Sequence, residues 1–548
     1  MSNSSNILQP SQPAIFVEDS SGNIDTFSLI GSLPLLFVKT ILIGIPLLLL
    51  YATAQRKTAS SLPPFRWLIQ RINAWQYLLW GPSIIQRKFD TAKGEPFEVL
   101  APDTRYVFVS SEKHINELDT APDTVLSLQA ASKQMLQPVY TMHGFNWFDR
   151  RGTEGVGFIR ALRTLLTNNL PRILPEVGYL VRRRLSKLHS ESPIQNGSRV
   201  SAIYPMIVNI VVLANAVSFF GKDIAKNESF MVSALAYVEE TLICAEIVRL
   251  TPKFLSPLIG GIIAHRLHSH QKIFDTLLQI AEERCQERDL KNLGHQVPKH
   301  DDCIQWIMET SPRKNPWTAK RVVHEVMAIW FGSVHALSTT ITFAIHDLSL
   351  HPEYVEPLRN ELSTSYEAFE RTGDGLPLLD SFIKESARLT PVESMSTRRS
   401  ALKPFIISDG TKLAPGDWAC TPVRAIMQNA DLYPSPLDFQ GFRFVDKETL
   451  EQLNIDAKVT QSKPSSLTTV DNTWHVWGTG RMACPGRFYA AAIMKVIVSQ
   501  MLLNYDCELV EKESSRWFTW RSSMLPKPST TVVLTHRTEE KSMATLVT

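Results

Sequence analysis

The segment from Trp477 to Phe488, with the sequence WGTGRMACPGRF, constrains the fold of this chain more than any other. It places Cys484 in a turn rich in glycine and proline, and the apolar stretch that follows predicts a helix over residues 488–503. A helix that starts just after a cysteine directs its positive end at the thiol and favours the thiolate. Because glycines also let backbone N–H groups approach the sulfur, Cys484 is a candidate ligand for a soft metal. The alternative is a structural cysteine at the start of a helix.

A second interpretation of the same segment is dinucleotide binding, because residues 478–483 (GTGRMA) match the pattern GxGxxG/A. That pattern requires a hydrophobic strand before it and a βαβ unit after it. Here the segment DNTWHVW precedes it, and only residues 484–548 follow. This context excludes the dinucleotide-binding interpretation.

Composition and charge exclude several other classes of protein. The chain has 548 residues, of which 44% are hydrophobic and 20% are charged, as expected of a folded protein with a large core. Its 57 Lys and Arg against 54 Asp and Glu leave a net charge of +3, too balanced for a protein that binds nucleic acid electrostatically. The 6 cysteines include no CxxC pair, which argues against a disulfide scaffold, a zinc ribbon or covalent haem attachment. A reducing compartment is therefore expected for most of the chain.

The N-terminal region has the charge pattern of a membrane anchor. Residues 1–32 contain no Lys or Arg, residues 33–54 are almost entirely apolar, and Arg56 and Lys57 follow at once. About 20 apolar residues span a bilayer, and flanking basic residues stay in the cytosol. We therefore expect a lumenal tail over residues 1–32, a transmembrane anchor over 33–54 and a cytosolic body. The alternative is a cleaved signal peptide, although this leader is longer and more acidic than such a peptide requires.

Residues 55–64 end in Pro63 and Pro64, which predict a stiff hinge because paired prolines cannot continue a helix. A single domain over residues 65–548 is expected to follow, since no later segment has the composition of a linker. Apolar residues at helical spacing predict long helices over residues 204–220, 229–250, 271–289 and 318–350. Strand patterns are few and short, at residues 106–109, 405–407, 507–510 and 530–534. The predicted fold class is mainly α with a small β component.

The Cys484 segment resembles the haem-thiolate signature of the cytochrome P-450 monooxygenases, particularly the CPGRF variant of fungal microsomal enzymes. Trp477 stands where the family usually has Phe. The resemblance implies the P-450 fold, preceded by the N-terminal transmembrane helix, and haem b (iron protoporphyrin IX) held by a cysteine thiolate. It identifies Cys484 as the iron ligand and Arg481 as a propionate partner. The residues that it implies around the haem are Trp477, Gly478, Arg481, Pro485 and Gly486.

Further motifs follow in the order that the family shows. Glu385 and Arg388 match its ExxR motif, and Arg443 lies in a segment, residues 436–444, that resembles its meander. The resemblance implies that these three side chains form a buried charge triad. Glu385 and Arg388 share one face of a helix at i and i+3, and a second arginine can satisfy the remaining carboxylate oxygen.

The resemblance also implies further cations at the haem propionates. Arg399 resembles the propionate-binding arginine that follows the ExxR helix, although Arg398 could fill that role. An arginine of the family's C helix is expected as well, and Arg160 and Arg163 are the two candidates, with Arg163 retained for the site.

The predicted helix over residues 318–350 resembles the family's I helix, which crosses the distal face of the haem. The family usually shows an acid and then a threonine at its oxygen-binding kink, whereas His335 and Ala336 occupy these places here. His335 and Ser338 are therefore the candidate catalytic residues. A neutral imidazole can donate and accept protons near neutral pH, so His335 is a candidate proton relay. The alternative is that His335 only packs at a helix kink.

The implied activity is that of a haem-dependent monooxygenase that oxidises a hydrophobic small molecule, with a fungal terpenoid or polyketide secondary metabolite as the expected substrate. Electrons would come from NADPH through an NADPH-cytochrome reductase. The anchor implies a single-pass protein of the endoplasmic reticulum membrane with a cytosolic catalytic domain and a possible N-glycan at Asn3. One alternative is a family member whose net reaction is not hydroxylation, such as an isomerase, a dehydratase or a ring-modifying oxidase. Another is a haem-binding sensor or carrier without turnover.

Overall fold

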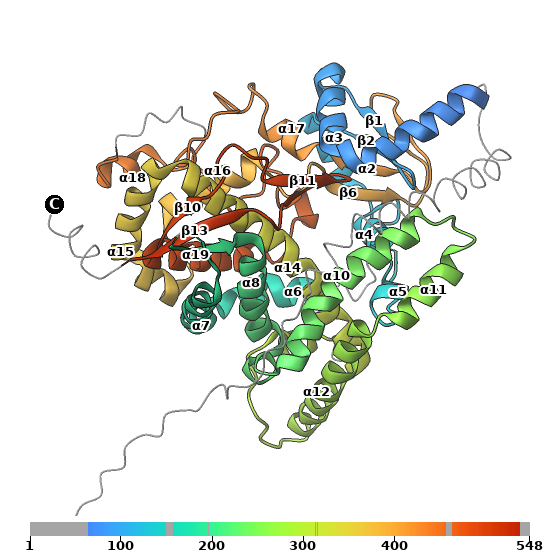
Figure 1. Cartoon of the computed structure of the whole chain (residues 1–548). Coiled ribbons are helices and arrows are strands. Elements are labelled where there is room, and N and C mark those ends of the chain that lie inside the picture. The colour runs from blue at the N-terminus through green and yellow to red at the C-terminus, as the bar shows by residue number, and fades with distance from the viewer. Residues whose placement is uncertain are drawn as a thin grey trace, which may run out of the picture. The chain divides into compact units, whose positions relative to one another are not determined.

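Helices form most of the fold, as the sequence predicts, and the strands gather in small sheets (Figure 1). The computed structural model describes residues 64–149, 157–195, 197–312, 314, 316–455 and 463–537. The predicted lumenal tail, transmembrane anchor and hinge up to Pro63 lie outside the described residues. Pro64 is the first residue of helix α2, a position at which proline is tolerated because its missing N–H would have no helical partner.

The helices of the described residues are long where the sequence shows apolar periodicity, and short in the connections. They are α2 (Pro64–Ala92), α3 (Glu112–Thr120), α4 (Leu128–Leu136), α5 (Pro138–Thr141), α6 (Gly157–Arg160), the π-helix η2 (Ala161–Leu166), α7 (Leu170–Glu191), α8 (Ile203–Phe220), α9 (Lys222–Ala225), α10 (Glu228–Leu250), α11 (Ser256–Arg266), α12 (Ser269–Asn292), α13 (Cys303–Glu309), α14 (Ala319–Leu350), the 3₁₀ turn η3 (Pro352–Tyr354), α15 (Val355–Thr372), α16 (Pro377–Leu389), α17 (Val423–Met427), α18 (Lys447–Gln452), the 3₁₀ turn η4 (Gly480–Met482) and α19 (Arg487–Asn504).

Helix α14 is the longest helix among the described residues and passes through the core. It begins where the Thr318 hydroxyl accepts a hydrogen bond from the N–H of Arg321, and it ends just before Pro352. It packs against α8, α12, α16 and α19, and most of its residues are buried. The predicted helix over residues 318–350 is confirmed, as are those that correspond to α8, α10, α12 and α19.

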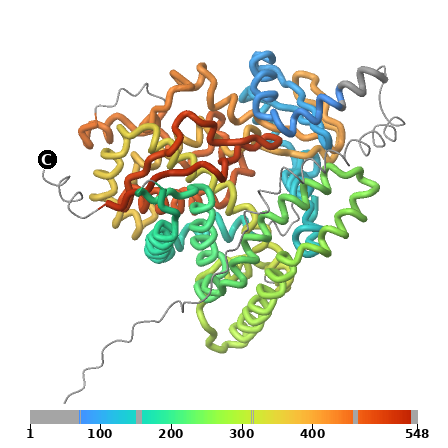
Figure 2. The backbone as a smooth tube through the Cα atoms, viewed as in Figure 1, coloured from blue at the N-terminus to red at the C-terminus, as the bar shows by residue number. Residues whose placement is uncertain are grey.

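The main sheet has five strands in the order β1-β2-β9-β6-β3, with β2 and β9 parallel and the other pairs antiparallel. A four-stranded sheet, β10-β13-β5-β4, joins segments that are far apart in the sequence, as Figure 2 shows where the red C-terminal strands run beside the green helices. Two hairpins, β7-β8 and β11-β12, complete the sheets. The strands are β1 (Phe97–Leu100), β2 (Arg105–Phe108), β3 (Leu126–Ser127), β4 (Ile194–Gln195), β5 (Ser198–Ala202), β6 (Ser396–Ala401), β7 (Phe405–Ile406), β8 (Lys412–Leu413), β9 (Trp418–Thr421), β10 (Tyr505–Leu509), β11 (Trp517–Trp520), β12 (Ser523–Pro526) and β13 (Thr531–His536).

Two described helices, α8 and α14, are long and apolar enough to cross a membrane by composition alone. In the most apolar window of each, 78% and 61% of the residues are buried within the protein. Both helices belong to the largest hydrophobic cluster, together with α19 and α16. Their apolar character is therefore explained by burial in the core.

Candidate active site

The Cys484 turn has the local structure that its glycines require. Gly478 and Gly480 have φ of +81° and +55°, in the left-handed region that favours glycine. A Cβ on Gly480 would lie 2.7 Å from a carboxylate oxygen of Asp119, so this turn packs closely on the end of α3. The N–H of Cys484 donates to the carbonyl of Trp477 at 2.7 Å, and α19 begins at Arg487.

Opposing effects act on the pKa of the Cys484 thiol. Burial raises the pKa of the Cys484 thiol, whereas the backbone N–H groups of Gly486 and Arg487 and the Arg487 guanidinium lower it. Arg487 donates from Nη1 to the carbonyl of Cys484 at 3.1 Å and from Nε to the carbonyl of Thr468 at 3.0 Å. Arg487 was not among the residues predicted from sequence, although its place directly after Pro485 and Gly486 could have indicated it.

Trp477 is held through its indole. Its Nε1–H donates to the carbonyl of Leu467 at 2.6 Å, and the indole N–H of Trp474 donates to the same oxygen at 3.2 Å. The two rings are thus fixed on one segment of the loop that leads into the Cys484 turn. The indole N–H of Trp477 therefore bonds to the carbonyl of Leu467, and the backbone carbonyl of Trp477 accepts the N–H of Cys484.

Arg481 and Arg399 both lie against α3 and the residues that follow it. Nη2 of Arg481 donates to the carbonyl of Ala121 at 2.8 Å and to Asp123 at 2.9 Å. Nη2 of Arg399 donates to Asp119 at 3.3 Å. Nε of Arg481 also donates to the backbone carbonyl of Asp119 at 3.4 Å, so Asp119 contacts both of the cations that the resemblance assigned to the propionates.

The two alternatives for the remaining cations are placed differently. Arg398 pairs with Glu393 at 2.6 Å, so it does not share the partner of Arg399. Arg160, at the end of α6, and Arg163, in η2, are both exposed. The charge of Arg163 is close enough to lower the pKa of Arg487, after burial the main cause of that shift. Of the two C-helix candidates, Arg163 is therefore the one whose charge acts on a residue beside the Cys484 turn.

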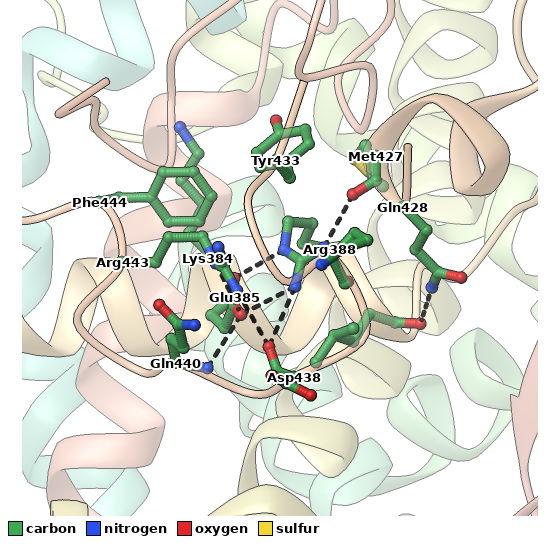
Figure 3. A network of polar contacts seen from close by, with 12 residues as sticks. Lys384, Glu385, Arg388, Met427, Gln428, Tyr433, Asp438, Gln440, Arg443 and Phe444 are labelled. Atoms are coloured by element: carbon green, nitrogen blue, oxygen red, sulfur yellow. Dashed lines mark hydrogen bonds and ion pairs between the residues drawn. The ribbon is translucent and has the colours of Figure 1, made fainter. Parts of the chain in front are cut away.

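The predicted charge triad is confirmed, and Figure 3 shows it from close by. The carboxylate of Glu385 accepts hydrogen bonds from Nε of Arg388 at 2.7 Å and from Nε of Arg443 at 3.0 Å. All three side chains are fully buried. The N–H of Gln440 donates to the same carboxylate at 3.0 Å. Nη1 of Arg388 also donates to the carbonyl of Met427 at 2.8 Å. A buried triad of this kind needs these additional hydrogen bonds to offset desolvation.

The middle of α14 has an exposed face although the helix lies in the core. Gly332 and Ala336, one turn apart, are exposed, and a Cβ on Gly332 would have nothing within 4 Å. Ser338 is fully buried, and its hydroxyl donates to the carbonyl of Val334 at 2.8 Å within the helix. Small side chains and open space therefore mark this face of α14.

His335 turns toward α8. Its Nδ1 lies 3.0 Å from the hydroxyl of Tyr204, and burial lowers the pKa of the imidazole to about 4. At neutral pH the ring is therefore uncharged. Its Nε2 is buried and has no hydrogen-bond partner among the described residues.

The donor set fits a haem and does not fit a metal held by protein ligands alone. Among the described residues, no group of three or more His, Cys, Asp or Glu could hold a metal ion. Cys484 would supply one sulfur ligand, so the remaining ligands would have to belong to a macrocycle that the metal brings with it. Fold and site together define a haem-thiolate protein.

Comparisons with known proteins agree. The family model described as Cytochrome P450 matches residues 159–534. The chain belongs to the cytochrome P-450 family. Cytochrome P-450 monooxygenase olcJ of Penicillium canescens is 28% identical over 81% of each chain. Monooxygenase paxP of Penicillium paxilli is 27% identical over 83% of this chain and 86% of its own, and monooxygenase 151 of Postia placenta is 26% identical over 90% and 97%.

Among solved structures, the retinoic acid-bound cyanobacterial CYP120A1 is similar, with a TM-score of 0.61 and 18% identity over 85% of this chain and 96% of its own. At that identity the likeness concerns the fold. The predicted fold, the haem with a cysteine thiolate ligand, and the haem-dependent monooxygenase activity are confirmed. The chain is an oxidoreductase of this class.

Proposed function

We propose that this monooxygenase inserts one atom of dioxygen into a hydrophobic small molecule of fungal secondary metabolism, with Cys484 as the iron ligand. Bound haem supplies dioxygen activation, which a thiolate ligand promotes by donating electron density. The observation that carries the assignment is the Cys484 turn, in which Gly478 and Gly480 adopt positive φ and the carbonyl of Trp477 accepts the N–H of Cys484. Helix α19 begins directly after Pro485 and Gly486. The relatives are fungal monooxygenases, which supports a place in fungal metabolism.

Arg481, Arg399 and Arg163 are the proposed propionate partners. The convergence of Arg481 and Arg399 at Asp119 supports a shared cationic site beside the turn. A propionate would add to or replace the contacts with Asp119 and Asp123, because bidentate arginine–carboxylate pairing is strong for either acid.

The proposed electron source is NADPH, through an NADPH-cytochrome reductase. A reductase surface rich in acidic groups would be attracted by exposed cations of the catalytic domain. Arg160, at the end of α6, is such a cation. Arg160→Glu should raise the KM for the reductase, and the expected effect should weaken at high ionic strength.

The proposed location is the endoplasmic reticulum membrane, with residues 33–54 as a single-pass anchor and the catalytic domain in the cytosol. Besides the anchor pattern, exposed apolar side chains on and before α11 support membrane contact: Phe254, Leu258 and Ile262. Protease protection in microsomes should spare a tag at residue 1 and digest the domain. A glycan at Asn3 fits this topology, whereas one at the exposed Asn227 would overturn it.

The proposed catalytic side chains are His335 and Ser338. Ala336 cannot hold a proton at the place where the family has an alcohol, so a neutral His335 would exchange protons there. Ser338 would influence this segment indirectly, by holding the local conformation of α14, since its hydroxyl donates to the carbonyl of Val334. A second candidate function, carried by Ala336, is a net reaction other than hydroxylation.

The deciding experiment is a comparison of metabolites from host cells with and without the protein and a P-450 reductase. A product that requires NADPH and contains one atom from labelled dioxygen supports the proposal. A product that contains no atom of dioxygen favours the second candidate function. Absence of any turnover with a range of hydrophobic extracts would contradict both.

A further inference from the structure

Helix α8 carries a tyrosine that touches the oxygen-activation segment of α14. The hydroxyl of Tyr204 lies 3.0 Å from Nδ1 of His335, although 131 residues separate them in sequence. Tyr204 is buried, and the helix that bears it is otherwise mostly apolar. A polar group in such a helix has to find a hydrogen-bond partner, and His335 is that partner.

Both members of the pair are uncharged at neutral pH. Burial lowers the pKa of His335 to about 4. Burial also raises the pKa of Tyr204 to about 12, although a hydrogen bond with the Thr339 hydroxyl acts in the opposite direction. In a neutral imidazole one ring nitrogen accepts and the other donates. When the phenol donates to Nδ1, the ring proton of His335 resides on Nε2.

Nε2 of His335 is the open end of the pair. It is buried and has no hydrogen-bond partner among the described residues. A buried polar group that stays unpaired costs about 1–3 kcal/mol, so a water molecule or a polar group of a ligand fits there. The adjacent residue, Ala336, belongs to the exposed face of α14.

A second contact from α8 holds the same segment of α14. Nδ2 of Asn215 donates to the carbonyl of Ser333 at 3.1 Å and reaches its hydroxyl at 3.2 Å. Tyr204 and Asn215 therefore fix α14 on both sides of Val334. The orientation of His335 is set by α8 and not by α14 alone.

We propose that Tyr204 is a positioning residue for proton delivery: its phenol fixes the ring and tautomer of His335, and the pair takes the place of the alcohol that Ala336 lacks. This inference rests on the proposed relay role of His335. When Nε2 gives up its proton, Nδ1 takes the phenolic proton and the phenol oxygen regains one from water. One proton thus passes from solvent to the acceptor and leaves His335 protonated on Nδ1. The starting tautomer returns when Nε2 takes a proton from a water molecule on its own side and Nδ1 gives one back through the phenol to solvent.

The test uses the full-length protein in microsomes with NADPH and a P-450 reductase, without added substrate. Without a relay, dioxygen leaves as peroxide, with one peroxide per NADPH; with a relay, reduction continues to water and the ratio falls. Tyr204→Phe should raise the ratio of peroxide to NADPH several-fold, and so should His335→Ala. The double variant should exceed neither, because the two residues act as a unit.

Tyr237→Phe is the matched control. Tyr237 is also a buried tyrosine whose hydroxyl donates to α14, at the carbonyl of Met327, but it lies away from His335. A second readout that does not depend on turnover is the stretching frequency of carbon monoxide bound to the reduced protein. Tyr204→Phe and His335→Ala should both shift this frequency, and Tyr237→Phe should leave it unchanged.

The outcomes separate the two proposals. If His335→Ala changes the ratio and Tyr204→Phe behaves as Tyr237→Phe does, Tyr204 has no positioning role and the relay proposal stands. If neither variant differs from the control, the relay role of His335 fails as well. Should Tyr204→Phe not retain haem, His335→Gln replaces it, because an amide can bond with Tyr204 but cannot exchange tautomers. An unchanged ratio in His335→Gln would overturn the inference.

Discussion

The hydroxyl of Tyr489 donates a hydrogen bond to Oδ1 of Asn215 at 3.0 Å, and it thereby joins α19 to α8. Tyr489 belongs to the first turn of α19, the helix that follows the Cys484 turn, and Asn215 also bonds with Ser333 of α14. The amide nitrogen of Asn215 thus bonds with Ser333, and its amide oxygen bonds with Tyr489. A buried bridge therefore connects α19, the helix beside the proposed iron ligand, with α14.

Asn215→Leu should destabilise the folded protein by about 1–3 kcal/mol, because the carbonyl of Ser333 loses the amide that bonds to it in the interior. Thermal unfolding of the haem-loaded protein measures the effect. Tyr489→Phe, which leaves the contact between Asn215 and Ser333 intact, should cost less, about 1 kcal/mol. A larger loss in Tyr489→Phe than in Asn215→Leu would contradict the bridge.

Cys484→Ala should abolish the red-shifted Soret band of the reduced, CO-bound protein, since only a thiolate ligand produces that band. Cys420→Ala is a suitable control, because Cys420 is free and fully buried in β9. Its band should stay in place, as should those of the Cys244 and Cys303 variants. Loss of the band in one of these controls, with Cys484→Ala unchanged, would refute the assignment.

Glu385→Ala should prevent haem retention, because it leaves Arg388 and Arg443 buried without their shared carboxylate. Breaking a buried ion pair in this way costs about 3–5 kcal/mol. The haem-to-protein ratio after purification is the measurement. Glu367→Ala, which removes an exposed pair with Arg371 on α15, should cost at most about 1 kcal/mol and leave haem content unchanged. Normal haem content in Glu385→Ala, with altered catalysis alone, would be incompatible with a structural triad.

The triad could be predicted from sequence because its motifs are short and occur in a fixed order. The same holds for Cys484 and for α14, whose apolar periodicity and flanking prolines mark both ends. Tyr204 and Asn215 could not be predicted, since their partners on α14 are 131 and 118 residues away. Local patterns carry no record of such pairings. The one signal in the sequence was that Tyr204 and Asn215 are polar residues within a mostly apolar stretch.

The partners of the cations were equally hidden from sequence. Arg481 and Asp123 are 358 residues apart, and only the packing of α3 on the Cys484 turn brings them together. In their own segments, Arg481 and Asp123 have the pattern of ordinary charged residues at a protein surface. The resemblance assigned Arg481 to a propionate, and its contacts with Ala121 and Asp123 became visible only in three dimensions.

Stability should fall at acidic pH in part because of His346, which is buried and whose ring nitrogens have no partner among the described residues. Burial, with the charge of Arg516, lowers the pKa of His346 to about 3, below its unfolded value of about 6.5. The unfolded state therefore binds a proton first as the pH falls below about 6.5. The free energy of unfolding then decreases by up to about 1.4 kcal/mol per pH unit from this residue.

His346→Phe should remove that contribution and flatten the dependence of stability on pH between about 6.5 and 4. Denaturant unfolding at a series of pH values measures it. The control is His295→Phe at an exposed position, which should leave the slope as it is in the unmodified protein. An unchanged slope in His346→Phe would show that the ring is protonated or solvated in the folded state.

Gly332 allows a test of whether the open face of α14 lies beside the haem. A Cβ at this position meets nothing within 4 Å, so Gly332→Ala should fold normally and gain about 0.5–1 kcal/mol from the higher helix propensity of alanine. Gly81→Ala is the contrasting case, since its Cβ would lie 1.8 Å from the carbonyl oxygen of Arg521, and it should lose stability. The affinity of nitrogen ligands for the haem iron, measured by absorbance, then shows how much space there is between the iron and residue 332. Gly332→Phe should weaken 4-phenylimidazole far more than imidazole, because only the larger probe would meet the new ring. Equal affinities for both probes in Gly332→Phe and in the unmodified protein would place this open face of α14 away from the haem.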